Sequence, residues 1–315
     1  MKIEKKDVEK YIKKVGPFLK KAKDIFKKYT WATLLYLKKS WRSVMVFVPS
    51  FLVIYYVFGA LLTHKIDTNL SFGESKEIKG YQALQTAADL IERETDKHLY
   101  TPNLPFVFPA YVLDNMPAFQ RGILKSVSTV VAGVAKNYNE PNIQKAKELL
   151  SYSPNVWLFS KTKDFKIAPS SVAQYRKARR KLIEFNEQVA PSAAILQNIK
   201  MLIIKDLADI SDFLDEKIKT TGFADADDVF YEAYGRLYAD YLFLKPFKNE
   251  SAPQIGTALE MLETALSTEP TIVQNGAIGR AFAANHLLEL SHFALKSYML
   301  LLSGENRILA DVNRD

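Results

Sequence analysis

The last long apolar stretch of the chain contains the residues best suited to hold a metal ion: His286, Glu289 and His292, spaced three apart. Residues at i and i+3 share a helix face, so Glu289 can neighbour either histidine. Glu-x-x-His is also the local unit of di-metal sites in helical bundles. Such a site needs a second unit of this kind, which the sequence lacks. Histidines in packed or surface positions are therefore favoured over a metal site.

A second candidate site combines Asp114, Glu232 and His286, which could serve a metal-dependent or acid–base hydrolase. This chemistry requires the fold to bring the three side chains into one cleft. The chain has no cysteine, which excludes thiol chemistry and Cys-zinc sites. It also has no Gly-x-Ser-x-Gly, Walker or dinucleotide-binding motif. We therefore expect no cofactor and favour a protein that is not an enzyme.

The aromatic, uncharged stretch Tyr100–Tyr111, within the loop 99–114, is a candidate for contact with a partner, a ligand or the membrane. Pro102, Pro105 and Pro109 prevent a regular helix there. An apolar loop of this kind is buried across the bundle, covered by a partner, or dipped into lipid. Burial is the favoured alternative. The side chains available for contact are Tyr100, Phe106, Phe108 and Tyr111.

These candidates must be positioned by a chain whose layout is set by one apolar segment. Ser43 to Thr63 is a run of 21 residues without a charge. A helix of this length is about 31 Å long, close to the ~30 Å hydrocarbon core of a bilayer. The run is too long for a cleaved signal peptide. It predicts one transmembrane helix that acts as an uncleaved signal anchor.

The charges around this segment predict its orientation. Residues 1–42 contain 14 Lys or Arg and four acids, whereas the whole chain has a net charge of +8. Basic flanks stay on the cytoplasmic side. We therefore expect a bacterial inner-membrane protein with a cytoplasmic N-terminus and a periplasmic C-terminal domain.

The basic arm has apolar residues at three- and four-residue steps, which predicts an amphipathic helix. Such a helix can lie in the headgroup layer of an anionic leaflet. Packing on a partner or on a second copy of the chain is the alternative, and nucleic-acid binding is disfavoured. The residues expected at the membrane surface are Lys13, Lys14, Lys20, Lys21, Lys27, Lys28, Trp41 and Arg42.

The remaining sequence predicts an all-α fold with an irregular multi-helix bundle, because alternating strand patterns are nearly absent. We expect Ser170 and Asp225 to cap helices and Pro191 to lie in the first turn of another. Gly304 is expected to end a last helix that begins near Ile278. The predicted segments are the arm 1–42, the span 43–63, a linker 64–78 and the helical domain 79–315.

Several short motifs support a family resemblance over roughly residues 80–315. They are Leu113–Pro117, Ala168–Ser171 followed by Gln174–Arg176, Val229–Gly235, and Asn275–Gly276 leading to Ala284–His286. In their order and spacing the chain resembles an uncharacterised inner-membrane family of proteobacteria, a domain of unknown function. The family has a tryptophan before Pro-Ser-Ser where this chain has Ile167 and Ala168. The resemblance implies a membrane-anchored helical protein and no reaction.

Taken together, these patterns favour an envelope scaffold or interaction module that binds a protein partner through its helical domain. The alternatives are a periplasmic hydrolase and a bundle that binds lipid or a small ligand. The sequence does not identify the partner.

Overall fold

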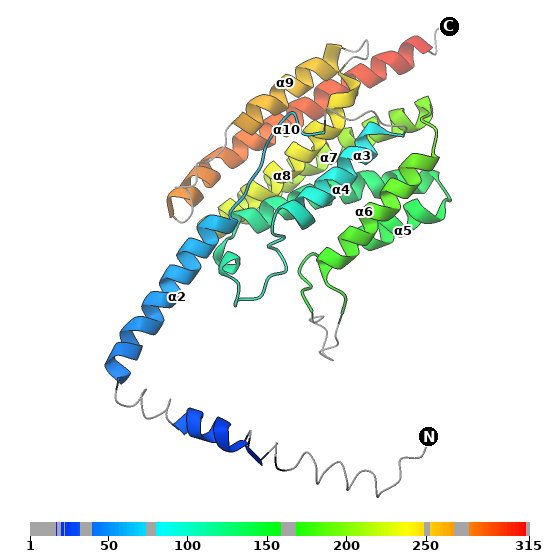
Figure 1. Cartoon of the computed structure of the whole chain (residues 1–315). Coiled ribbons are helices and arrows are strands. Elements are labelled where there is room, and N and C mark those ends of the chain that lie inside the picture. Colours follow the sequence, from blue (N-terminus) through cyan, green and yellow to red (C-terminus); the bar gives the residue numbers. More distant parts are fainter. Residues whose placement is uncertain are drawn as a thin grey trace, which may run out of the picture. The chain divides into compact units, whose positions relative to one another are not determined.

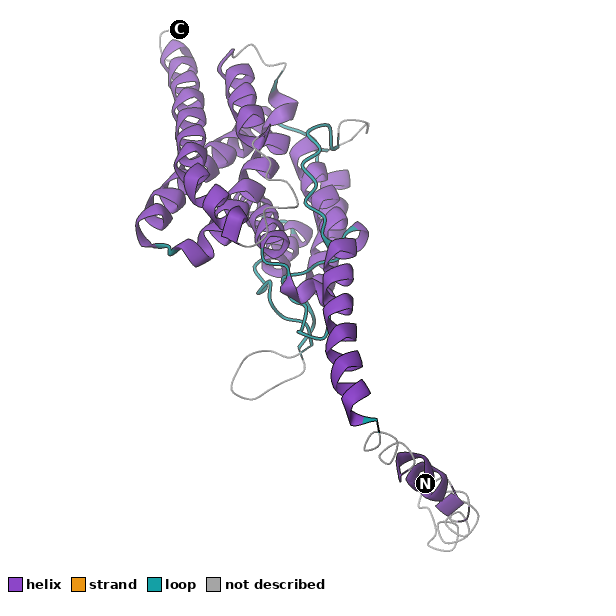
Figure 2. Ribbon diagram, turned by 90° about the vertical axis from the view of Figure 1, so that its left-hand side faces the viewer, coloured by secondary structure: helices purple, strands orange, loops and turns teal. Residues whose placement is uncertain are grey.

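The computed structural model of the chain describes residues 17, 20, 21, 23–31, 40–73, 80–158, 168–248, 253–267 and 277–312 (Figure 1). Every regular element among these residues is a helix, and none is a strand (Figure 2). The predicted all-α fold is therefore confirmed. The chain divides into two compact units, Met1–Phe58 and Gly59–Asp315.

The first unit contains most of α2, Trp41–Thr63, which begins two residues before the predicted span. None of the 23 residues of α2 is buried, although an 18-residue window of the helix has a mean hydropathy of 2.2. By length and composition this helix can cross a membrane. It is the single helix of this kind within the described ranges. Residues 23–31 of the arm are also helical.

The second unit is a bundle of helices and short helical turns. Its elements are α3 (Gln82–Glu92), the π-helix η1 (Arg93–Lys97), the 3-10 turn η2 (Pro109–Val112), α4 (Asn115–Asn137), α5 (Pro141–Leu150), α6 (Ser171–Gln188), α7 (Ala193–Thr220), the 3-10 turn η3 (Phe223–Asp225), α8 (Ala226–Leu244), the 3-10 turn η4 (Lys245–Phe247), α9 (Pro253–Ser267) and α10 (Ala277–Val312).

Helix α8 lies at the centre of this bundle. It packs against α3, α4, α7, α9 and α10, and nearly all of its side chains are buried. Its aromatic rings fill the core: Phe230 stacks on Tyr234, and Phe119 of α4 lies against Tyr234 and Tyr238. Helices α5 and α6 pair with each other beside α3 and α4.

The helix starts follow ordinary capping chemistry, with two differences from the predictions. Ser170 caps α6 as expected, because its side chain accepts a hydrogen bond from Ala173 N. Pro191 does not lie in the first turn of α7 as predicted, because the helix begins at Ala193. Ser192 caps the helix by accepting a hydrogen bond from Ile195 N. Asp225 occupies the N-cap position of α8, but its side chain makes no capping hydrogen bond. The 3-10 turn η3 leads directly into α8 there.

The prediction that Gly304 ends the last helix is wrong. Helix α10 continues through Gly304 to Val312. A Cβ at residue 304 would lie 3.2 Å from the side chain of Gln254 in α9. The glycine therefore permits a close approach between α9 and α10, and does not act as a left-handed C-cap.

Two glycines set the closest helix crossing of the bundle. A Cβ on Gly122 of α4 would overlap Glu232 O of α8, and a Cβ on Gly235 of α8 would overlap Phe119 O of α4. The two backbones are thus in direct contact at this crossing. Any larger residue would separate the helices that form the centre of the core.

Residues 64–73, predicted as part of a linker, pack onto the bundle. Ile66, Leu70 and Phe72 lie against the core. Tyr238 donates to Asn69 O at 2.9 Å, and Lys245 donates to Leu70 O at 2.7 Å. The segment that follows α2 is therefore part of the folded domain up to Gly73.

Replacement of Gly235 by alanine tests the α4–α8 crossing. We expect Gly235→Ala to lower the free energy of unfolding by about 1–3 kcal/mol, because the added methyl group forces two backbones apart. The measurement is urea unfolding of the full chain in detergent, with circular dichroism as the readout. Gly256→Ala in α9 is the matched control, since nothing lies within 4 Å of its Cβ position. Equal or greater loss of stability in the control would contradict this account.

Candidate functional site

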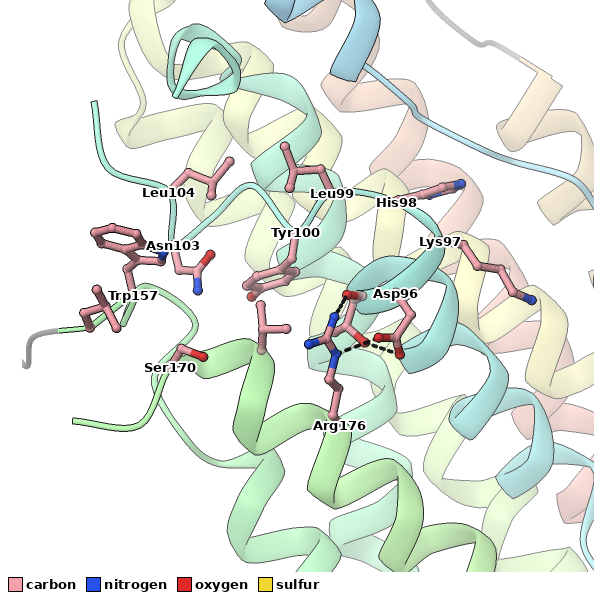
Figure 3. Close-up of a pocket in the computed structure, with 13 residues that line it drawn as sticks. Asp96, Lys97, His98, Leu99, Tyr100, Asn103, Leu104, Trp157, Ser170 and Arg176 are labelled. Carbon is pink, nitrogen blue, oxygen red and sulfur yellow. Dashed lines mark hydrogen bonds and ion pairs between the residues drawn. The ribbon is translucent and has the colours of Figure 1, made fainter. Parts of the chain in front are cut away.

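An open groove of about 490 Å³ lies where the end of α3, the following loop and the start of α6 meet. Figure 3 shows side chains from these segments around it, with Trp157 on one side and Arg176 on another. The lining combines acidic, basic, aromatic and apolar groups. Its residues are Thr95, Asp96, Lys97, His98, Leu99, Tyr100, Asn103, Leu104, Trp157, Leu158, Ser170, Val172 and Arg176.

The π-helix η1 supplies the charged edge of the groove. His98 N donates to Arg93 O at 2.8 Å, which is the i to i+5 pairing of a π-turn. The wider turn buries Arg93 and Glu94, two consecutive charged residues, and leaves Asp96 and Lys97 at the surface. Such π-turns are frequent at functional sites.

The opposite edge is held by α6 and by a short backbone pairing. Ser171 N donates to Val156 O at 2.8 Å, and Ala168 N donates to Leu158 O at 3.0 Å. These bonds position Trp157, whose ring meets Phe108 edge-on at 5.9 Å. The indole is therefore held in place by the fold.

Several polar groups of the groove are already engaged by the protein. Arg176 binds Asp96 Oδ1 at 2.6 Å and donates to Thr95 O at 2.8 Å. Asn103 donates to Val156 O at 3.1 Å, and Ser170 caps α6. No hydrogen-bonded pair of nucleophile and base occurs among these contacts. The arrangement suits binding through stacking and ion pairing better than catalysis.

Below the groove lies a buried ionic network centred on Glu94. Its carboxylate accepts from Arg93 Nε at 2.7 Å and from Gln120 Nε2 at 3.0 Å, and His98 Nδ1 lies 3.6 Å away. Arg93 also donates to Tyr238 at 2.8 Å. Gln120 continues the network, because its carbonyl oxygen accepts from Thr101 N and Oγ1.

The network keeps its charges despite burial. Burial alone would raise the pKa of Glu94, but His98, Arg93 and Gln120 outweigh it and lower the pKa. Burial alone would also lower the pKa of Arg93, which Glu94 and Tyr238 raise instead. A paired carboxylate and guanidinium therefore form a rigid floor that fixes η1 to α4 and α8.

The structure gives Asp114, Glu232 and His286 different partners. Asp114 caps α4 through Asn115 N at 3.0 Å, and its Oδ2 lies 3.9 Å from Arg280. Glu232 pairs with Lys125 at 3.3 Å. His286 bonds Phe282 O at 2.8 Å and stacks on the Phe282 ring. The described contacts join no two of the three, so they do not form the acid–base arrangement that a hydrolase requires.

The histidine-rich part of α10 also forms no evident metal centre. His286 Nε2 lies 3.9 Å from Glu289 Oε2, and His292 is exposed. Among the described residues no three His, Cys, Asp or Glu side chains are grouped so that they could hold a metal ion. The acidic start of α8 is paired with arginines, since Asp227 lies 3.6 Å from Arg280 and Asp228 lies 3.5 Å from Arg121.

The residues predicted to contact the membrane surface or a partner differ in how far they are exposed. Lys13 and Lys14 lie outside the described residues, and the other predicted surface residues are exposed: Lys20, Lys21, Lys27, Lys28, Trp41 and Arg42. In the loop, Tyr100 is buried and Phe108 is half-buried, whereas Phe106 and Tyr111 are exposed. The favoured prediction of a buried strap therefore holds for only part of the loop.

A second buried network, between α4, α7 and α8, was not predicted. Arg236 binds Asp206, whose other oxygen accepts from Ser126 Oγ at 2.5 Å. Asp240 is fully buried and receives no hydrogen bond from a donor among the described residues. Burial, and then the neighbouring Asp206, raises the pKa of Asp240 well above its ordinary range. Burial therefore favours the protonated, neutral form of Asp240.

This proton makes stability depend on pH. The folded chain keeps it on Asp240, whereas the unfolded chain releases it above about pH 4. As the pH rises from about 4 to the pKa of Asp240 in the folded chain, the free energy of unfolding should fall by up to about 1.4 kcal/mol per pH unit. We expect Asp240→Asn to remove this contribution, because the amide has the same shape as the neutral acid and does not titrate.

The measurement is urea unfolding at several pH values, and the quantity compared is the difference in slope between variant and native protein. Asp209→Asn, which removes an exposed carboxyl on the same helix as Asp206, controls for the lost charge. Parallel pH dependences for the native protein and Asp240→Asn would show that Asp240 is ionised in the fold.

Within the described part of the chain, the groove beside η1 is the strongest candidate binding site, because charged and aromatic side chains from separate segments meet there at an open surface. No protein-family model, curated protein or solved structure matches the chain.

Proposed function

We propose that the protein is a single-pass inner-membrane protein whose periplasmic helical domain binds an envelope protein partner and catalyses no reaction. The observation that carries the proposal is α2, an apolar helix of 23 residues with no buried side chain. In water such a surface would be strongly unfavourable, at about 25 cal/mol per Å² of apolar area. A bilayer provides the missing apolar environment.

The charge distribution supports the orientation. The 14 basic residues among the first 42 favour retention of the arm in the cytoplasm. Ile25, Phe26 and Tyr29 are exposed on the helical part of the arm, together with Lys27 and Lys28. Apolar and cationic side chains on one short helix suit an anionic headgroup layer.

The groove beside η1 supports the binding role. It presents an indole, an ammonium group and a carboxylate–guanidinium pair on a rigid base, which suits a protein segment with both apolar and charged side chains. Aromatic and arginine side chains are the usual anchors of protein interfaces. A small ligand of the periplasm is the alternative occupant, because the groove volume is in the range of ligand sites.

Membrane topology tests the first half of the proposal. A reporter active only in the periplasm should be active when fused after Asp315 and inactive when fused before Met1, because the basic arm resists translocation. The full chain should also stay in the membrane fraction after an alkaline carbonate wash. Release by the wash, or a cytoplasmic C-terminus, would refute the proposal.

Photo-crosslinking in intact cells tests the second half. A photoreactive residue at Lys97, on the groove edge, should trap one protein reproducibly, whereas the same residue at the exposed Lys219 of α7 should not. Loss of the crosslink in Trp157→Ala would tie it to the groove. Identical products from both positions, or none from Lys97, would contradict a partner at this groove.

A further inference from the structure

The loop between α3 and α4 reaches the last turn of α2. Gly59 has no side chain, and a Cβ at this position would overlap Pro109 of the turn η2. Further along both segments, Lys65 N lies 3.3 Å from Met116 Sδ. The two contacts align the loop with the end of α2, so that residues between Pro109 and Met116 lie beside residues between Gly59 and Lys65. Figure 1 shows the loop next to this end of the helix.

This alignment gives the loop a depth relative to the predicted span. Gly59 lies four residues before Thr63, the last residue of the uncharged run. At about 1.5 Å per residue, Pro109 is therefore level with a point about 6 Å inside the end of the span. Polar or charged residues follow both segments, since His64 and Lys65 come after the run and Asp114 comes after the loop. Burial lowers the pKa of His64, and the nearby Asp114 carboxylate opposes this shift.

Apolar side chains on both sides of Pro109 are exposed. Phe106 is 67% exposed, Tyr111 57% and Val112 55%. The stretch from Leu99 to Leu113 contains no charged residue. Tyrosine is enriched at membrane–water interfaces, where its ring lies among lipid and its hydroxyl reaches water. A continuous apolar surface next to a membrane helix has the chemistry of a lipid contact.

We propose that the tip of this loop, Phe106–Val112, inserts into the outer-facing leaflet beside α2 and forms a second membrane contact of the domain. This inference rests on the proposed membrane span of α2. The occupant is the bilayer itself. The loop backbone can enter the interface because η2 and the turns before it satisfy part of their own hydrogen bonds: Phe108 N donates to Pro105 O, Tyr111 N to Phe108 O and Leu113 N to Ala110 O.

The chain has no native cysteine, so single labels can be placed without background. A nitroxide is attached to Val112→Cys or Phe106→Cys in the full chain, reconstituted in vesicles of phosphatidylethanolamine and phosphatidylglycerol. Collision with O₂, which concentrates in lipid, is compared with collision with a water-soluble nickel chelate. Val53→Cys in α2 serves as the lipid reference, and Met299→Cys, an exposed apolar position of α10, serves as the matched control.

Insertion predicts a higher ratio of O₂ to nickel collisions at residues 112 and 106 than at residue 299, in the direction shown by residue 53. A water-like ratio at both loop positions, with residue 53 in lipid, would refute the loop insertion and leave the membrane span intact. Low collision rates with both reagents would also refute it, because a second copy or another protein surface would then cover the loop. A water-like ratio at residue 53 would refute the span and the insertion together.

Discussion

The direct backbone contact between α4 and α8 at Gly122 and Gly235 is the constraint on which the bundle depends. Two helices that touch without intervening side chains leave no space for adjustment, so their rotation and register are fixed. That register places Ser126 and Arg236 on facing positions, and it places Gln120 beside the π-turn. Both buried polar networks therefore lie close to one crossing.

The two networks are more relevant to a unique fold than to stability. A buried ion pair contributes little compared with a well-packed apolar core, whereas loss of one partner costs about 3–5 kcal/mol. Arg93 with Tyr238, Glu94 with Gln120, and Arg236 with Asp206 connect helices that are distant in sequence. A packing that separates these helices leaves a buried charge without one of its partners, which penalises misregistered bundles.

Helices and caps could be predicted from local pattern, because each depends on neighbouring residues. Ser170 before an apolar period, or the run from Ser43 to Thr63, needs no information from elsewhere in the chain. The continuation of α10 through Gly304 could not be predicted, since only the distant Gln254 explains that glycine. The groove could not be predicted either. Arg176 lies in a basic stretch of the sequence, and its partner Asp96 is brought to it by the π-helix η1. Arg93 and Glu94 lie in the polar run Glu92–Lys97, which gives no local sign that two of its charges are buried.

The segment that follows α2 limits where a partner can bind. Asn69 and Leu70 are bound to the bundle by Tyr238 and Lys245, and the ring of Phe72 lies against the guanidinium of Arg93. If α2 spans the bilayer as proposed, the folded domain begins within a few residues of the lipid headgroups. A partner must therefore itself come to the membrane surface.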